Sequence, residues 1–195
     1  VALHLYAPVC AHVAARLQGL AVGERVGLYL SRSPDLVASL LACLRLGLCF
    51  VPLEPDFPLE RLQGIARQAR LSAVICDEEA GTPDFGCPLR PLKGPAPGGA
   101  LSWPRVDDAL AAYMMFTSGS TGEPKAIPKA WPQLEAELRV QMALWGERLA
   151  DTRVLASVSH QHIYGLLFRI LLPLALGLPF DRRSIDYPEQ LALQT

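Results

Sequence analysis

A nine-residue segment, residues 117–125, combines the residue types that bind a polyphosphate. It reads TSGSTGEPK, with four hydroxyl side chains, two glycines and one lysine, and it directly follows the apolar run at residues 111–116. Glycines let the backbone adopt positive φ and approach a ligand closely, and successive N–H groups of such a turn bind an anion. The hydroxyls add neutral donors, and Lys125 adds a point charge for a terminal phosphate. The pattern predicts a buried strand that leads into a phosphate-binding loop.

This segment differs from the loop of the P-loop nucleotide-binding proteins, which requires G-x-x-x-x-G-K-[ST]. Counted from Gly119, Pro124 stands where the second glycine would be, and Ala126 replaces the hydroxyl that binds magnesium. A polar surface turn is the alternative interpretation, but such a turn does not need a lysine at a fixed distance. We therefore predict phosphate binding by a loop of another type.

Composition and charge argue against nucleic acid and anionic membranes as partners. The 195 residues are 51% hydrophobic and 19% charged, with a formal net charge of −1, which leaves no electrostatic footprint for either partner. Arg61, Arg67 and Arg70 cluster at helical spacing, so they are expected on a solvent-exposed helix face. The composition is that of a soluble globular protein.

The cysteines and the start of the chain indicate a cytoplasmic protein. An odd number of cysteines without C-x-x-C spacing argues against a disulfide framework, and we expect reduced core thiols at Cys10, Cys43, Cys49, Cys76 and Cys87. Residues 1–20 are interrupted by polar residues, so they do not read as a signal peptide. Residues 164–180 are apolar apart from Arg169, but this run is short and contains Pro173 and Gly177. A buried helix is therefore expected there, and no membrane span.

Strand-like and helix-like segments alternate in the first part of the chain. Short apolar runs predict buried strands at residues 25–30, 49–53 and 72–76. Ser33 as N-cap and Pro34 at the first helical position open a helix that ends at Gly47, and a second helix starts at Pro58. Strands separated by such helices predict βαβ crossovers and an α/β fold with a mostly parallel sheet.

Helical periodicity assigns a core face to each predicted helix. The first helix offers Leu36, Leu40, Leu41 and Leu44, the second Leu59, Leu62, Ile65 and Ala69, and a helix at residues 132–147 offers Leu134, Leu138, Met142 and Trp145. Residues 126–129 and 153–157 are predicted as further strands, and an apolar helix is predicted from Ile163.

Residues 81–104 interrupt this alternation, since they contain six prolines and five glycines. Such a composition predicts a loop or an irregular excursion instead of a packed element. A linker between two domains is the alternative. A surface excursion within one domain is favoured because the strand pattern resumes at Ala111.

Three segments together resemble one enzyme family. Residues 117–125 fit a loop rich in hydroxyls and glycine that ends in Pro-Lys, and residues 44–55 read LRLGLCFVPLEP, with Glu54 where an aspartate is usual. Residues 162–165 read H-I-Y-G, similar to an H-x-x-G segment beside an acyl pocket. These segments resemble the adenylate-forming enzymes: acyl-CoA synthetases, aryl and fatty-acid ligases, and peptide adenylation domains. The resemblance implies a doubly wound α/β domain.

The resemblance also implies an ATP-dependent acid–thiol ligase. Such enzymes join an acyl or aryl carboxylic acid to ATP with Mg²⁺, and then pass the acyl group to coenzyme A or to the phosphopantetheine of an acyl carrier protein. By this resemblance Lys125 neutralises the departing pyrophosphate, and His162 orients the carboxylate. The residues implied to hold the β- and γ-phosphates are Thr117, Ser118, Gly119, Ser120, Thr121, Gly122 and Lys125. No protein-bound metal site is expected, because His160 and His162 have no cysteine or carboxylate cluster nearby.

The chain departs from the family beyond these motifs. The later Tyr-Gly-x-Thr-Glu and Thr-Gly-Asp motifs and a C-terminal lysine do not occur in it. We therefore expect residues 1–195 to be a partial N-terminal AMP-binding domain without the C-terminal domain, inactive on its own. Amino-acid-activating domains are disfavoured, because their aspartate for the substrate amine normally lies where this chain reads H-x-x-G.

Two other functions are compatible with the sequence. A phosphotransferase would need a magnesium-binding carboxylate near the loop, and only Glu123 offers one. A truncated homologue without catalysis would bind nucleotide or act as a scaffold. Loss of ATP binding in a Lys125→Ala variant would separate nucleotide binding from a scaffold.

Overall fold

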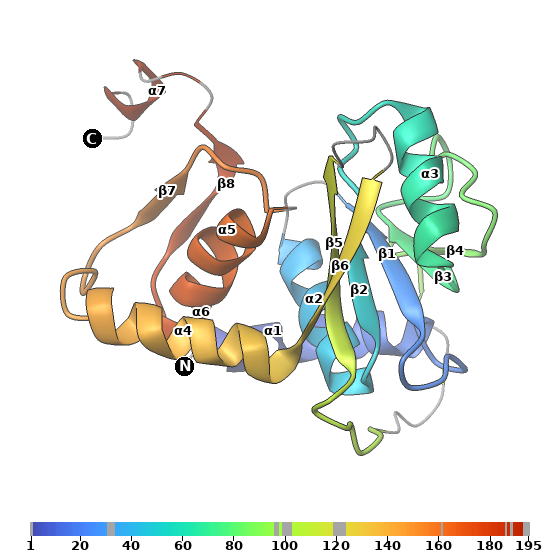
Figure 1. The fold of residues 1–195 in the computed structure, drawn as a ribbon, viewed down its shortest axis with the longest axis horizontal. Coiled ribbons are helices and arrows are strands. Elements are labelled where there is room, and N and C mark those ends of the chain that lie inside the picture. The colour runs from blue at the N-terminus through green and yellow to red at the C-terminus, as the bar shows by residue number, and fades with distance from the viewer. Residues whose placement is uncertain are drawn as a thin grey trace. The chain divides into compact units, whose positions relative to one another are not determined.

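The structure, a computed structural model, describes residues 2–30, 34–95, 98, 103–118, 124–160, 162–185, 187 and 189–192 (Figure 1). The chain divides into two compact units. We call His4–Gln133 the sheet unit, and Leu134–Thr195 together with Val1–Leu3 the C-terminal unit.

The sheet unit is built on six strands in the order β4-β3-β1-β2-β5-β6. All neighbouring strands are parallel except β5 and β6, which form an antiparallel hairpin. Its elements are α1 (Ala2–Arg16), β1 (Arg25–Tyr29), α2 (Pro34–Leu46), β2 (Cys49–Pro52), α3 (Leu59–Ala69), β3 (Ala73–Cys76), β4 (Leu89–Pro91), β5 (Ala111–Ser118) and β6 (Pro124–Ala130). The prediction of an α/β fold with a mostly parallel sheet is confirmed.

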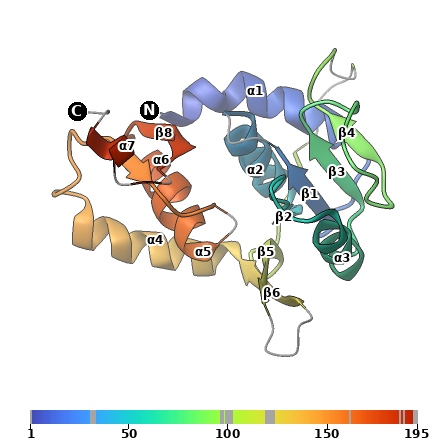
Figure 2. The same cartoon turned by 90° about the horizontal axis from the view of Figure 1, so that it is seen from above.

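Helices α2 and α3 cover opposite faces of this sheet (Figure 2), so the sheet is doubly wound, as the resemblance implied. The chain passes from β1 through α2 to β2, and then through α3 back across β1 to β3. The predicted N-cap Ser33 lies outside the described residues. The predicted end of α2 is confirmed, because Gly47 comes directly after it with φ 68°, a left-handed conformation that favours glycine.

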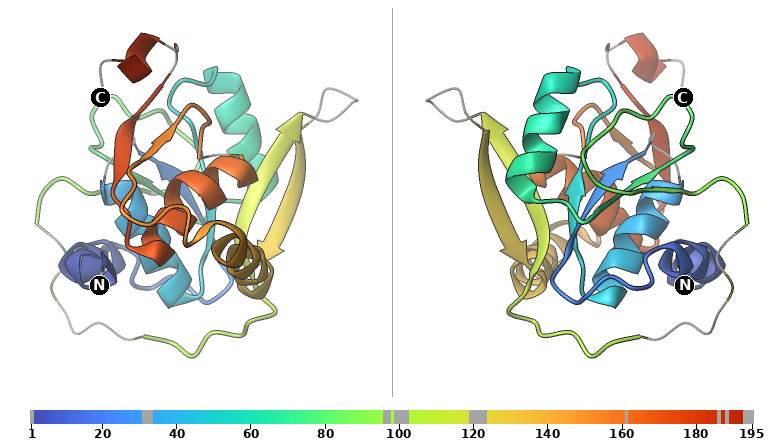
Figure 3. Two further views of the ribbon diagram at one scale, coloured as in Figure 1. Left: turned by 90° about the vertical axis from the view of Figure 1, so that its left-hand side faces the viewer. Right: turned by 90° about the vertical axis from the view of Figure 1, so that its right-hand side faces the viewer.

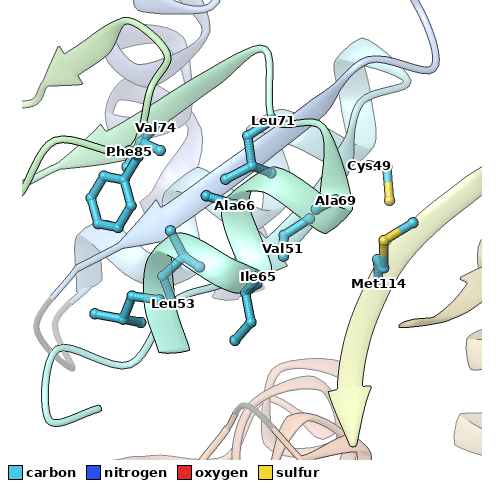
Figure 4. Packing of buried hydrophobic residues seen from close by; sticks show 11 residues of the cluster. Cys49, Val51, Leu53, Ile65, Ala66, Ala69, Leu71, Val74, Phe85 and Met114 are labelled. Carbon is cyan, nitrogen blue, oxygen red and sulfur yellow. The ribbon is translucent and has the colours of Figure 1, made fainter. Parts of the chain in front are cut away.

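The core between α3 and the sheet is explained by strand alternation (Figure 4). Every second residue of β2 and of the chain just after it, Cys49, Val51 and Leu53, faces α3, and Met114 of β5 joins them. From the helix, Leu62, Ile65, Ala66 and Ala69 are buried. Burying such side chains stabilises the unit by about 1.5–3 kcal/mol for each large one.

Two residues predicted on core faces are exposed instead. Leu59 is the first residue of its helix and is 49% exposed, and Trp145 is the last residue of its helix and is 42% exposed. In α2 burial extends beyond the predicted stripe to Val37, Ala42 and Cys43. A helix packed between a sheet and a second helix buries more than one stripe, and α1 provides that second contact through the Cys10 thiol, which donates to the Ala38 carbonyl at 3.5 Å.

The first part of the predicted excursion, residues 81–95, contains structure that the sequence did not predict. It contains the short strand β4, which pairs with β3, and it buries Phe85 against Tyr29 with the ring centroids 5.4 Å apart. The buried Arg16 of α1 fixes the end of β4, since its guanidinium donates to the carbonyls of Pro91, Leu92 and Gly94. Composition alone could not show these long-range contacts.

The C-terminal unit combines a helix, a small parallel sheet and a broken apolar helix. Its elements are α4 (Trp131–Trp145, whose first turn belongs to the sheet unit), β7 (Val154–Ala156), α5 (Ile163–Gly165), the π-helix η1 (Leu166–Leu171), α6 (Leu172–Leu176), β8 (Phe180–Ser184) and α7 (Glu189–Ala192). Strands β7 and β8 pair in parallel. The predicted apolar helix therefore ends at Leu176, and the sequence did not predict β8. Among the described residues, no helix has the length and apolar character needed to cross a membrane.

Four of the five predicted core cysteines are buried, whereas Cys87 is only half-buried, and all five are free. Burial raises the pKa of Cys49 from its ordinary 9.0 to about 11, and burial together with Cys49 raises the pKa of Cys43. Because the folded state holds these protons more tightly, their contribution to stability is complete below about pH 9 and is lost as pH rises.

We therefore expect the free energy of unfolding to fall between about pH 9 and pH 11, by about 1 kcal/mol per pH unit for Cys49 alone. Urea unfolding at pH 8 and pH 10 measures this. A Cys49→Ala variant should lose that share of the pH dependence. An unchanged pH dependence in the variant would contradict the assignment.

Candidate functional site

The residues that flank the predicted phosphate loop are the paired ends of β5 and β6, which run side by side as a hairpin (Figure 3). Thr117 pairs with Lys125, and Ser118 pairs with Pro124. The four predicted loop residues Gly119, Ser120, Thr121 and Gly122 lie outside the described residues. The structure thus places both flanks of the loop opposite each other.

These flanks lie at the carboxyl edge of the parallel sheet. β5 is parallel to β2, which is parallel to β1, and β1 is parallel to β3. The end of β5 therefore lies at the same edge as the ends of those strands. Open α/β sheets bind ligands at this edge, so the two flanks lie where a ligand site is expected.

Strand alternation sets the direction of Thr117 and Lys125. The neighbouring pair, Phe116 and Ala126, packs against the core beneath α3. Because successive side chains point to opposite faces, Thr117 and Lys125 point to the other face. Thr117 is half-buried and Lys125 is exposed.

Within the described part of the chain, no hydrogen bond or ion pair engages the Lys125 ammonium. A cation of this kind next to a hydroxyl provides one point charge and one neutral donor on the same face of the hairpin. Such a pair can neutralise and orient a terminal phosphate.

Strand β6 is the outermost strand of the six, and its sequence suits that position. Pro124 and Pro128 cannot donate to a neighbouring strand, and the lysines at 125 and 129 add charge. Prolines and lysines are the usual protection of an edge strand against pairing with another chain. β6 is therefore suited to remain at the edge of the sheet.

Glu54 is a buried carboxylate at the same edge, directly after β2. Its carbonyl accepts a hydrogen bond from the Phe57 N–H at 3.0 Å, and the Arg61 guanidinium lies 4.0 Å from the Phe57 ring centroid. The turn after β2 is thus tied to α3. The sequence showed Glu54 only as a departure from the family motif and did not predict its burial.

His162 directly precedes the continuous helical segment formed by α5, η1 and α6. It is the N-cap residue of α5 with extended backbone, φ −83° and ψ 142°, and its side chain makes no capping hydrogen bond. Its N–H donates to the Ser159 carbonyl at 3.3 Å, and its carbonyl accepts from the Leu166 N–H at 2.9 Å. The side chain is exposed, so neither capping nor core packing explains this histidine.

The other histidine of the pair differs from His162 in its environment, since His160 is only 4% exposed. Among the described residues, no group of three or more histidine, cysteine, aspartate or glutamate side chains could hold a metal ion. Tyr164, by contrast, is largely exposed next to His162, with its ring 4.5 Å from that of Phe168. The segment therefore presents an imidazole and an aromatic surface to solvent.

Comparison with known proteins identifies the family. A family profile described as AMP-binding enzyme matches residues 7–180. The chain belongs to the AMP-binding enzyme family. The mostly parallel sheet of the described structure agrees with this membership.

The curated relatives of this AMP-binding chain include peptide synthetases. It is 43% identical over 124 residues to syringomycin synthase SyrB1 of Pseudomonas syringae pv. syringae. That alignment covers 59% of this chain and 20% of the relative. It is 34% identical over 167 residues to AMB antimetabolite synthetase AmbB of Pseudomonas aeruginosa, in an alignment that covers 80% of this chain and 13% of the relative. An L-proline–[L-prolyl-carrier protein] ligase of Pseudomonas fluorescens is 34% identical over 126 residues, covering 56% and 25%. Nonribosomal peptide synthetase agiA of Aspergillus flavus is 41% identical over 110 residues, which cover 49% of this chain and 1% of that protein. The relatives thus include the class of enzyme that the H-x-x-G segment disfavoured.

Solved structures agree in fold. The fatty acid AMP ligase from Legionella pneumophila aligns with a TM-score of 0.78 at 22% identity, covering 95% of this chain and 35% of that one. The O-succinylbenzoate coenzyme A synthetase from Bacillus subtilis, solved with ATP and magnesium ion, aligns with a TM-score of 0.75 at 19% identity, covering 97% and 52%. The AMP-binding chain thus spans about half or less of the proteins it matches.

Proposed function

We propose that the native protein containing this chain activates a carboxylic acid with ATP as an acyl-adenylate and then transfers the acyl group to a thiol. The observation that carries the proposal is the exposed Lys125, unpaired among the described residues and opposite Thr117, at the carboxyl edge of the sheet of an AMP-binding family member. An exposed ammonium at this edge of the sheet supports the binding of a triphosphate there.

In this proposal ATP lies with its β- and γ-phosphates on the hairpin turn. The Thr117 hydroxyl and the Lys125 ammonium approach them from one face, and the loop contributes Ser118, Gly119, Ser120, Thr121 and Gly122. The triphosphate held by Thr117 and Lys125 would carry Mg²⁺, which would neutralise part of the phosphate charge. Thr117 and Lys125 fit the binding of phosphate because they supply a hydroxyl and an ammonium donor, and no described carboxylate contacts Lys125.

The first half-reaction needs little covalent chemistry from the protein. A carboxylate oxygen attacks the α-phosphorus, the bond between the α-phosphorus and the bridging oxygen breaks, and pyrophosphate leaves with the electron pair. Charge builds on the leaving group, so catalysis consists of positioning and charge neutralisation. Lys125 supplies the neutralising charge.

We assign the carboxylate end of the reaction to His162. Its exposed imidazole is engaged by no described residue, and an imidazole N–H can donate to a carboxylate oxygen. In the second half-reaction a thiolate attacks the acyl carbon, the acyl–oxygen bond breaks, and AMP leaves as a thioester forms.

The acceptor proposed is the phosphopantetheine thiol of a carrier protein, with coenzyme A as the alternative. Relatives at 34–41% identity include a nonribosomal peptide synthetase and an L-proline–[L-prolyl-carrier protein] ligase. The acid is a small acyl, aryl or amino acid. We further propose that residues 1–195 form the front part of an N-terminal AMP-binding domain and do not turn over alone, since the matched proteins are about twice as long or longer.

ATP–pyrophosphate exchange by the native protein, across a panel of fatty, aryl and amino acids, tests this function. Exchange that depends on one class of acid supports it, and transfer to a loaded carrier protein or to coenzyme A then assigns the acceptor. The absence of exchange with every acid would overturn it.

A His162→Ala variant should raise the KM for the carboxylic acid about tenfold and leave the KM for ATP unchanged, because one hydrogen bond to a charged group contributes about 1.5 kcal/mol. Exchange kinetics with each substrate varied in turn measures this. Tyr187→Ala, at an exposed residue of the same unit, is the control. A rise in the ATP KM alone would contradict the assignment.

A further inference from the structure

The backbone of Ser159 and His160 lies so close to Gly165 that no other residue fits at position 165. A Cβ added to Gly165 would lie 2.0 Å from the Ser159 carbonyl oxygen, 2.6 Å from its carbon and 3.1 Å from the His160 nitrogen. Gly165 has ordinary helical torsions, φ −67° and ψ −38°. The missing side chain is therefore required by close approach of the backbone and not by an unusual conformation.

One helical turn after Gly165, the buried Arg169 contacts the chain just before Ser159. Arg169 is 4% exposed, and its Nη1 donates to the Val158 carbonyl at 3.3 Å. A guanidinium out of water is costly unless its donors are bonded. Its burial therefore ties the helix to the residues just before Ser159.

The helix is widened at the position of this arginine. The segment Leu166–Leu171 is a π-helix, in which the Leu172 N–H donates to the Leu167 carbonyl five residues earlier. Pro173 provides a physical reason, because its ring would crowd the carbonyl of Arg169 in a regular α-helix. π-bulges occur frequently at functional sites.

We propose that Gly165 and Arg169 are positioning residues for His162, an inference that rests on the proposed function. The His162 imidazole is exposed and makes no capping bond, so its place is set by the backbone. That backbone is bonded to Ser159 on one side and to Leu166 on the other. Gly165 and Arg169 fix Ser159 and Val158, and so set where the imidazole meets the carboxylate.

The first test is Gly165→Ala in the native protein, with Gly64→Ala as matched control. A Cβ on Gly64, in α3, would meet nothing within 4 Å. We expect the Gly165→Ala change to raise the KM for the carboxylic acid at least tenfold with the ATP KM unchanged. Hydrogen exchange at the amides of His162 and Leu166 should also become at least tenfold faster, while Gly64→Ala leaves both readouts unchanged.

Arg169 provides a second variant should Gly165→Ala fail to fold. Arg169→Met should show the same change in carboxylate KM, and Arg169→Lys, which keeps a donor, should restore much of it. A purely structural role would instead lower the melting temperature of both variants and leave the carboxylate KM unchanged.

The outcomes separate the two claims. A wild-type protein that exchanges pyrophosphate, with Gly165 and Arg169 variants that keep its carboxylate KM, overturns the positioning role alone. A wild-type protein without exchange activity for any acid overturns the proposed function and this inference with it.

Discussion

Replacing Lys125 with alanine should lower the rate of carboxylate-dependent ATP–pyrophosphate exchange by about a hundredfold. The ammonium faces the charge that develops on pyrophosphate, and removing one such preorganised donor costs about 10²–10³ in rate. Because Lys125 is exposed and unpaired among the described residues, the melting temperature should not change. Initial rates of exchange at saturating carboxylic acid measure the effect.

Two variants control this result. Lys129→Ala removes the same charge four residues further along β6, away from the turn, and should retain most of the activity. Lys125→Arg keeps the charge and should keep more exchange than Lys125→Ala. If Lys125→Ala and Lys129→Ala exchange pyrophosphate equally fast, the hairpin is not the phosphate site.

The largest loss of stability is expected at Gly27, in the middle of β1. A Cβ there would lie 2.8 Å from a methyl carbon of Leu53, 2.8 Å from one of Leu71 and 3.0 Å from one of Val74. All three neighbours are buried, so Gly27→Val should overpack the core and lower the free energy of unfolding by about 3 kcal/mol. Urea unfolding followed by circular dichroism measures this.

Leu71→Ala combined with Gly27→Val should recover part of that loss, because it vacates space next to the new side chain. Gly64→Ala is the control, since an open helical position gains up to about 1 kcal/mol from alanine. Equal stability of Gly27→Val and wild type would show that β1 does not pack against Leu53 and Leu71 as described.

The sequence predicted the parallel part of the fold because local signals there agree with the tertiary structure. Short apolar runs alternate with helices that begin at proline, and α2 ends at a left-handed glycine. The same reasoning did not predict β4 or β8. β8 has the polar sequence FDRRS, and β4 ends at Pro91, whose carbonyl accepts a hydrogen bond from the distant Arg16. Neither strand therefore shows the apolar run that predicts a strand from local sequence.

The site was predictable to a similar extent. Residue types alone indicated the phosphate loop, and the structure shows that its flanks face each other at the carboxyl edge of the sheet. The roles of Gly165 and Arg169 were not predicted. The sequence used Arg169 only as an argument against a membrane span. Its hydrogen bond to the Val158 carbonyl could not be predicted, because that contact depends on how the chain folds back.

Isotope transfer tests the central claim most directly. The native protein is given ATP, a thiol acceptor and a substrate acid whose two carboxylate oxygens are ¹⁸O. Attack of the carboxylate on the α-phosphorus predicts AMP that carries one ¹⁸O atom, because the bridging oxygen leaves with AMP when the thiol attacks the acyl carbon. Unlabelled AMP, or ADP together with labelled inorganic phosphate, would show that no acyl-adenylate forms.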